Sequence, residues 1–186
     1  MDERKKEIEG IDGWTVFQDR IILKTPIVTI KAGPVRCRRS GKQKDFYLFD
    51  FPDWVNVVAL TPDKDMVIIR QFRYGSNRME IEIPGGMVND QEPPVDAGCR
   101  ELLEETGYAG SNARIIGKVC PNPAIQRNYC YTVLVENAVQ EAEPDMDDME
   151  DIECFLLPDR EVFKLIATGA IDHGLVLNAL MFYRGL

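Results

Sequence analysis

The chain has 186 residues, of which 45% are hydrophobic. This length favours one domain, or one domain with an extra arm. The formal net charge is -9, and the sequence holds no long Lys/Arg cluster. This charge balance argues against partners that are recognised by positive charge, so we expect no nucleic-acid partner and no membrane partner. An acidic enzyme that acts on an anionic substrate needs metal ions or a local basic patch.

The N-terminal sequence and the cysteine pattern indicate the cellular compartment of the protein. The first ten residues, MDERKKEIEG, are charged and lack the apolar core of a signal peptide, and no apolar run is long enough to span a bilayer. The five cysteines are an odd number without CxxC spacing, which disfavours a disulfide framework or a zinc site. We therefore predict a cytoplasmic protein.

The first fifty residues read as strands. Residues 14–37, WTVFQDRIILKTPIVTIKAGPVRC, predict two or three short strands broken at Lys-Thr-Pro and Ala-Gly-Pro. Residues 45–51, DFYLFDF, predict another strand that Pro52 closes. Residues 1–50 are accordingly expected to form a β-rich extension, and residues 51–186 the main domain.

Two apolar β-branched runs follow, at 55–60 and 66–74. The residues between them, TPDKD, have turn chemistry, so we expect a hairpin. The next strand, MEIEIPGG, ends at a Pro-Gly-Gly break.

A helix is predicted after this break. Pro93 and Pro94 suit its first turn, and Gly107 stands where a left-handed residue ends a helix. The expected buried stripe has helical spacing and consists of Val95, Cys99, Leu102, Leu103 and Thr106.

The second half alternates strands and helices. Strands are predicted at 113–120, 129–139 and 152–158, with an acidic loop at 140–151. Helices with an acidic start and a glycine end are predicted at 159–169 and 172–185. The order indicates an α/β fold in which a mixed β-sheet is sandwiched between helices. His173, the single histidine, is interpreted as a structural residue beside an apolar helix.

The most informative stretch is RELLEETG, residues 100–107. Glu101, Glu104 and Glu105 fall within about one helical turn, where like charges repel one another. Either this face is solvated, or a cation lies in front of it. Glu101 and Glu105 are roughly 6 Å apart along the helix axis, so both can reach one cluster of divalent ions.

The stretch belongs to a longer pattern, which runs from Gly86 to Tyr108. The fixed positions are Gly86, Glu92, Arg100-Glu101, Glu104-Glu105 and Gly107, followed by the bulky Tyr108. This pattern resembles the signature of the Nudix hydrolase family, and the resemblance implies the Nudix fold.

The resemblance also implies a metal site. Its main ligands are Glu101 and Glu105, with the Gly85 carbonyl as an additional ligand. Glu104 is implied as a catalytic residue, either a further ligand or a support. Hard oxygen ligands select Mg²⁺ or Mn²⁺, with two or three ions expected.

Residues outside the signature resemble the ADP-ribose pyrophosphatase branch, which hydrolyses nucleoside diphosphate sugars. The stretches IIRQFRYG and EIPGG carry this resemblance, together with the acidic loop PDMDDMEDIECF. In that branch the loop supplies a metal ligand and the base that activates water. Here these roles fall to Glu150 and Asp148, with Asp147 as a rival base.

Three further residues are substrate-site candidates, of which Glu82 resembles a residue of this branch. Arg73 would contact phosphate, although it could equally be a strand-end arginine paired with a carboxylate. Glu82 would act near the substrate and metals, or simply face solvent. Trp54, like Phe51 and Tyr74, would stack on a base or pack in the core.

The branch implies a homodimer, in which the N-terminal β segment, residues 1–50, swaps across to the partner and helps to bind the partner's substrate. The expected reaction is Mg²⁺-dependent cleavage of ADP-ribose or a related nucleoside diphosphate sugar into a nucleoside monophosphate and a sugar phosphate. The alternatives are another nucleotide substrate, such as a dinucleoside polyphosphate, coenzyme A or a nucleoside triphosphate, or a non-catalytic sensor that binds nucleotide sugars.

Overall fold

The computed structural model describes residues 7–11, 13–146, 149 and 151–185. The chain folds into two compact units. The first unit holds residues 1–52 together with 122–128, and the second holds 53–121 and 129–186. None of the helices in the described part of the chain is both long and apolar enough to cross a bilayer.

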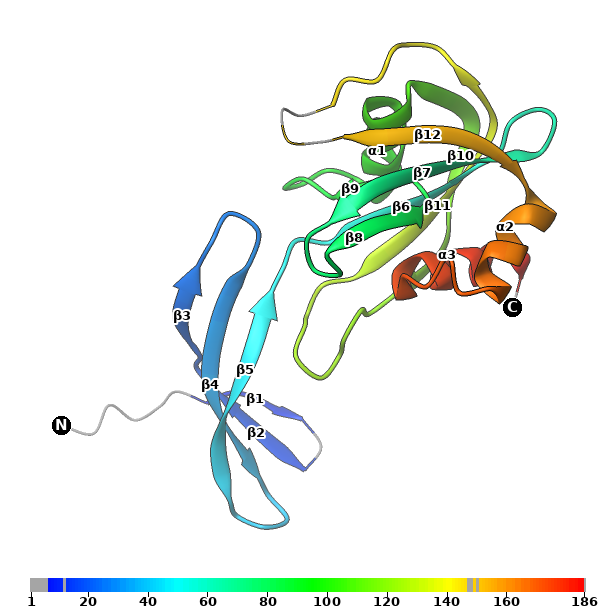
Figure 1. The fold of residues 1–186 in the computed structure, drawn as a ribbon. Coiled ribbons are helices and arrows are strands. Elements are labelled where there is room, and N and C mark those ends of the chain that lie inside the picture. Colours follow the sequence, from blue (N-terminus) through cyan, green and yellow to red (C-terminus); the bar gives the residue numbers. More distant parts are fainter. Residues whose placement is uncertain (1–6, 12, 147–148, 150, 186) are drawn as a thin grey trace. The chain divides into compact units, whose positions relative to one another are not determined.

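The first unit is an antiparallel five-stranded sheet (Figure 1). Its strands are β1 (Glu7–Ile11), β2 (Trp14–Phe17), β3 (Arg20–Lys24), β4 (Thr29–Cys37) and β5 (Gln43–Asp50). The long strand β4 is central, because it pairs with β2, β3 and β5. The loop 122–128 joins this unit through the amide of Phe49, which donates a hydrogen bond to the carbonyl of Ile125 at 2.8 Å.

The second unit contains two sheets. The first has the strand order β10 (Tyr108–Val119), β11 (Cys130–Gln140), β6 (Trp54–Ala59) and β9 (Gly85–Met87). The second has the order β12 (Ile152–Pro158), β7 (Asp65–Arg73) and β8 (Arg78–Glu82). Strands β11 and β6 are parallel, whereas the other pairs are antiparallel.

The sequence predicts a hairpin of β6 and β7, but the structure confirms only the turn between them and not the pairing of the two strands. The turn is present, because the amide of Lys64 bonds to the carbonyl of Thr61 at 2.9 Å. A single antiparallel bridge joins Leu60 to Met66, and the two strands then belong to different sheets. Their neighbours β11 and β12 supply the pairing partners that a hairpin would have supplied.

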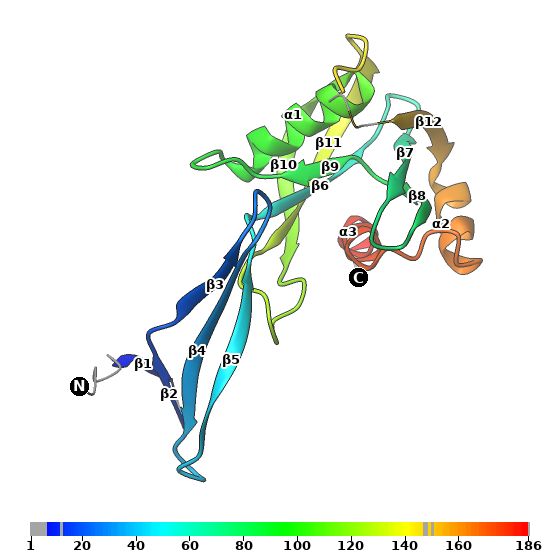
Figure 2. The same ribbon diagram turned by 60° about the vertical axis from the view of Figure 1, so that its left-hand side comes forward.

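Helices cover both faces of these sheets (Figure 2). Val55 and Val57 of β6 pack in one core with Leu102 of α1 (Pro94–Thr106). Val58, which points to the opposite face of the strand, packs with α2 (Asp159–Ala167) and α3 (Gly174–Arg184) in a second core. This alternation confirms the predicted α/β class, with mixed sheet between helices.

Helix α1 begins and ends as the sequence predicts. Pro94 lies in its first turn, and Gly107 ends it in the left-handed region with φ +74°. The expected buried stripe is only partly right, since Cys99 and Leu103 are exposed. The helix instead buries Ala97, Gly98, Leu102, Glu105 and Thr106. Its sheet-facing side therefore carries a carboxylate, which the hydrophobic pattern did not reveal.

Candidate functional site

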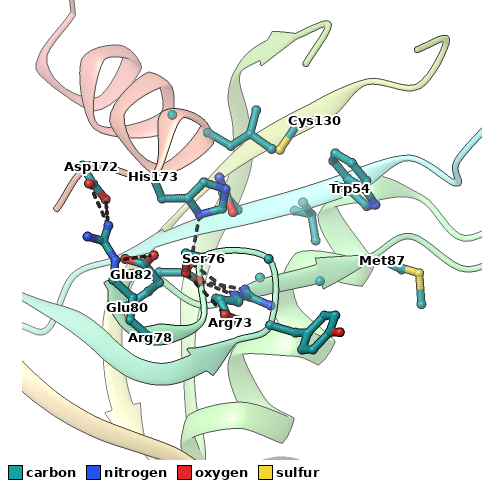
Figure 3. A pocket seen from close by; sticks show the side chains of 18 residues that line it. Trp54, Arg73, Ser76, Arg78, Glu80, Glu82, Met87, Cys130, Asp172 and His173 are labelled. Carbon is teal, nitrogen blue, oxygen red and sulfur yellow. Dashed lines mark hydrogen bonds and ion pairs between the residues drawn. The ribbon is translucent and has the colours of Figure 1, made fainter. Parts of the chain in front are cut away.

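The second unit contains a pocket of about 650 Å³. This volume lies within the usual range for small-molecule sites. Its wall comes from the ends of β6, β7, β8 and β9 and from the start of α3 (Figure 3). The polar wall includes Arg73, Glu82 and His173, whereas Trp54 and Cys130 contribute apolar surface.

Glu82 is a buried carboxylate at the centre of the polar wall. Its side chain is only 2% exposed, and its oxygens accept hydrogen bonds from three neighbours. Arg73 donates from Nη2 at 2.7 Å and from Nε at 3.1 and 3.2 Å, and Gln71 donates from Nε2 at 3.3 Å. The Nδ1 atom of His173 lies 2.9 Å from Glu82 Oε1.

These neighbours keep Glu82 ionised. Burial alone would raise the pKa of its carboxyl group, but the hydrogen bonds from His173 and Arg73 outweigh burial and lower the pKa to about 2. The two partners are much less covered, with side-chain exposures of 43% for Arg73 and 38% for His173. The carboxylate thus anchors two side chains that border the pocket.

A second ion cluster lies beside the first. Arg78 donates to both carboxylate oxygens of Asp172, at 2.6 and 2.7 Å, and to Glu80 at 2.9 Å. Arg78, Glu80 and Glu82 alternate along β8, so they share one face of the strand. Asp172 and His173 are adjacent in the segment before α3, and this segment is therefore tied to β8 at two consecutive residues.

Another wall of the pocket is the glycine bend, defined here as Gly85 and Gly86. The amide of Gly85 donates to Glu105 Oε2 at 3.0 Å, which satisfies a carboxylate that is only 5% exposed. A Cβ atom at position 86 would lie 2.4 to 2.5 Å from the carboxylate atoms of Glu101. The bend thus brings the pocket next to the acidic face of α1.

Arg100 organises the remaining carboxylates of this face. Its Nη1 donates to Glu101 and to Glu104, both at 2.9 Å, and its Nε donates to Glu92 at 2.9 Å. The bond from Arg100 is the main reason that the pKa of Glu92 falls to about 2. In the segment 89–107 Arg100 is the only basic residue, so it cannot neutralise Glu92, Glu101, Glu104 and Glu105 together.

This excess of carboxylate fits a divalent cation. Carboxylate and carbonyl oxygens are the donors that Mg²⁺ and Mn²⁺ prefer. Within the described residues, no three His, Cys, Asp or Glu side chains converge closely enough to enclose an ion. The predicted ligand Glu150 and the predicted bases Asp148 and Asp147 lie outside the described residues.

The structure places the other predicted residues as follows. Trp54, Arg73, Glu82 and Gly85 all line the pocket, whereas Glu101, Glu104 and Glu105 lie on α1. The alternative prediction, that Glu82 faces solvent, is wrong, because Glu82 is only 2% exposed. Tyr74 is 90% exposed at the pocket and is therefore not a core residue.

Sequence reasoning missed six polar residues of this site, namely Asn56, Ser76, Arg78, Glu80, Asp172 and His173. His173 was interpreted as structural, yet it lines the pocket and bonds to Glu82. Asp172 and Asn56 also line the pocket. Their partners on β8 and β9 are far away in sequence, so no local spacing could have linked them. The only available signal was the position of His173 at the start of a predicted helix.

Comparisons with known proteins agree with this geometry. A family model described as NUDIX domain matches residues 51–179. The chain is 28% identical over 146 residues to ADP-ribose pyrophosphatase of Bacillus subtilis (strain 168), covering 78% of this chain and 79% of that protein. It is 32% identical over 127 residues to ADP-sugar pyrophosphatase of Mus musculus, covering 65% and 58%.

A solved structure shares the fold. The crystal structure of ADP compounds hydrolase matches with a TM-score of 0.82, at 17% identity and with 96% of each chain covered.

Proposed function

Because this chain belongs to the Nudix family, we propose that it hydrolyses the diphosphate bond of ADP-ribose or a related nucleoside diphosphate sugar. The names of the two relatives support this substrate class, as they are an ADP-ribose and an ADP-sugar pyrophosphatase. The observation that carries the proposal is the glycine bend. It joins a pocket of nucleotide-sugar size to the carboxylates of Glu101 and Glu105.

The proposed reaction is a hydrolysis. The oxygen of water bonds to one phosphorus, and the bond from this phosphorus to the bridging oxygen breaks. The products are a nucleoside monophosphate and a sugar phosphate. The proton of the attacking water passes to a carboxylate of the acidic loop, for which Asp148 is our candidate and Asp147 its rival.

Other residues would bind the substrate and the metal ions. Arg73 at the pocket wall would bind phosphoryl oxygens, since a guanidinium suits them geometrically. Trp54 offers an aromatic face to a base. Glu101, Glu105, the Gly85 carbonyl and Glu150 would hold Mg²⁺ or Mn²⁺, with Glu104 and Arg100 supporting them. Cations bound there would neutralise charge on the phosphoryl oxygens and lower the pKa of the attacking water.

A substrate panel tests this function. Nucleotide sugars, a dinucleoside polyphosphate, coenzyme A and a nucleoside triphosphate are each incubated with the protein and Mg²⁺, and phosphate is measured after phosphatase treatment. We expect ADP-ribose or another nucleotide sugar to be cleaved fastest. Preferred cleavage of one of the other nucleotides would reject the substrate class, and no cleavage of any would favour the sensor alternative.

The Glu105→Gln variant tests the metal assignment. Glutamine keeps an acceptor for the Gly85 amide, so the fold should be unchanged, whereas the loss of the negative charge should lower turnover by several orders of magnitude. Turnover is measured against Mg²⁺ concentration, and circular dichroism checks folding. Wild-type turnover in this variant would exclude Glu105 as a ligand.

We further propose that the protein is a cytoplasmic homodimer that associates through its first unit. The support is an edge strand: among the described strands, β3 pairs only with β4. Ile21, Ile22 and Leu23 are consecutive on β3 and all more than half exposed, so both faces of the strand present apolar side chains. An exposed apolar edge of this kind is usually covered by another chain.

A further inference from the structure

His173 is one of the pocket residues that the proposed reaction leaves without a role. It precedes α3, and its backbone carbonyl accepts the first hydrogen bond of that helix, from the amide of Leu177 at 3.0 Å. Its ring lies on the polar wall beside Glu82 (Figure 3). The side chain is more than one third exposed, whereas its carboxylate partner is covered. A purely structural histidine would not need this access to the pocket.

Glu82 determines which ring nitrogen of His173 carries the proton. An ionised carboxylate can only accept hydrogen bonds, and the guanidinium of Arg73, which donates to Glu82 Oε2 at 2.7 Å, stabilises the ionised form of Glu82. The Nδ1 atom at 2.9 Å must therefore be the donor. In the neutral imidazole this leaves Nε2 with a lone pair, which makes it a hydrogen-bond acceptor.

The Nε2 atom has no hydrogen-bond partner among the described residues, because the only polar contact of this side chain there is with Glu82. Two other polar groups on this wall are donors, namely the guanidinium groups of Arg73 and Arg78, whose carboxylate neighbours Glu80, Glu82 and Asp172 are bonded to them. Phosphoryl oxygens suit those donors but not an acceptor. The acceptor on His173 instead suits a ligand group that carries its own hydrogen.

Asn56 supplies the complementary observation. It lines the same pocket from β6, and its Nδ2 atom is buried without a hydrogen-bond partner in the described structure. Buried amide donors are rarely left unpaired in proteins, so an atom of water or of a ligand is expected to accept from this one. An unused donor and an unused acceptor in one pocket match a hydroxyl group, which can accept from one and donate to the other.

We propose that His173 is a specificity-determining residue that accepts a hydrogen bond from a sugar hydroxyl of the substrate, with the Asn56 amide as the donor to that hydroxyl. Glu82 is then a positioning residue, which fixes the ring of His173 and the guanidinium of Arg73. This inference rests on the proposed function for the identity of the sugar, but the binding it describes does not require turnover.

The single histidine allows a direct test by NMR. Protein without added histidines is labelled with ¹⁵N-histidine, so that all imidazole signals belong to His173. Ribose 5-phosphate and methyl phosphate are compared as probes, because both carry a phosphate and only the first carries sugar hydroxyls. We expect ribose 5-phosphate to shift the Nε2 resonance and methyl phosphate to leave it unchanged.

Each result of this titration is decisive. A resonance that neither probe moves would overturn the proposal, as would equal shifts with both probes, which would place phosphate against His173. If ribose 5-phosphate moves the resonance but no nucleotide sugar is hydrolysed in the panel, the proposed reaction fails while the hydroxyl contact stands.

Kinetics of His173→Asn separate recognition from a structural role. The asparagine amide can replace Nδ1 as the donor to Glu82, but it has no group at the position of Nε2. We expect KM for the nucleotide sugar to rise about tenfold, the usual effect of one lost hydrogen bond, with little change in kcat. A structural role predicts unchanged KM, because the bond to Glu82 is kept.

Two further variants complete the test. Glu82→Gln can donate to the ring as well as accept from it, so the tautomer is no longer fixed and the ¹⁵N spectrum should change before any probe is added. Arg70→Gln is the matched control, because Arg70 lies on β7 near Arg73 but bonds to the exposed Glu153. An unchanged spectrum in Glu82→Gln, or an altered KM in Arg70→Gln, would contradict the assigned roles.

Discussion

Gly85 and Gly86 are neighbours, but a side chain would meet different obstacles at the two positions. A Cβ atom at position 85 would lie 2.2 Å from the backbone carbonyl oxygen of Val55. At position 86 the three nearest atoms would all belong to the carboxylate at the end of the flexible Glu101 side chain, at 2.4 to 2.5 Å. The backbone cannot yield without disturbing the pairing of β6 and β9, whereas the carboxylate can rotate away.

Alanine substitutions should therefore separate stability from activity. Gly85→Ala is expected to lower the free energy of unfolding by several kcal/mol, about the cost of overpacking a core site. Gly86→Ala should remain nearly as stable as the wild type but lose most of its Mg²⁺-dependent turnover, because Glu101 is displaced. Urea unfolding and substrate hydrolysis measure the two effects. Equal activity in Gly86→Ala and the wild type would show that the position of Glu101 is not critical.

The low pKa of Glu82 predicts how stability depends on pH. The folded-state pKa of about 2 lies below the ordinary value of 4.5, so the stabilisation is fully present above pH 4.5. It is lost as the pH falls from 4.5 towards 2. The difference in unfolding free energy between wild type and Glu82→Gln should narrow across this window. Urea titrations at pH 7, 4 and 3 measure it, and a constant difference would contradict the assigned partners.

The residues of the site differ in how well sequence predicts them. Glu101, Glu104 and Glu105 occupy fixed spacings on one helix, so a local pattern identifies them. His173 and Asn56 reach the pocket only because β6 and the start of α3 border it, as does β8. Their roles depend on long-range packing and on a neighbouring carboxylate, neither of which leaves a trace in local spacing.

At the scale of elements, the end of α1 shows what local chemistry can predict. Gly107 was expected to be left-handed, and it is, with φ +74°. The inward orientation of Glu105 was not expected, because amphipathic patterns assign carboxylates to the solvent face. The hairpin of β6 and β7 was wrongly predicted for a similar reason: turn residues specify a turn, but not which strands pair after it.

Gly107→Ala should destabilise the fold more than a left-handed conformation alone explains. Left-handed alanine costs about 1 kcal/mol, and a Cβ atom here would also lie 2.0 Å from the carbonyl oxygen of Ala142. Gly169→Ala is the matched control, since Gly169 has φ +76° and nothing within 4 Å of its Cβ position. Chemical denaturation of both variants gives the comparison. Similar losses would mean that the Ala142 contact relaxes without cost.

At the scale of the whole molecule, the exposed edge of β3 predicts the oligomeric state. Sedimentation velocity at micromolar concentration should show a dimer. Replacing Ile21 and Leu23 by lysine should shift the protein towards the monomer, because charged side chains oppose edge association. The control is Leu156→Lys, an exposed apolar position in the second unit. A wild-type monomer would refute the proposal, and so would a dimer that survives the double substitution.

The extent of each unit was only partly predictable. Strand propensity marked the first fifty residues as a β-rich segment, and that segment forms one sheet. The contribution of loop 122–128 to the same unit was not foreseen. This contribution depends on the pairing of Phe49 with the backbone of Ile125 and Gln126, more than seventy positions later in the sequence. Composition and turn signals do not encode such long-range pairing.

This discontinuity limits modular exchange of the N-terminal unit. A chimaera spliced at residue 52 would transfer β1 to β5 of the donor without the donor's loop 122–128. The transferred sheet would lose the Ile125 carbonyl that accepts the hydrogen bond from the Phe49 amide, and the recipient's own loop would contact foreign residues. Grafting experiments that seek to trade substrate preference between relatives should therefore move both stretches of chain together.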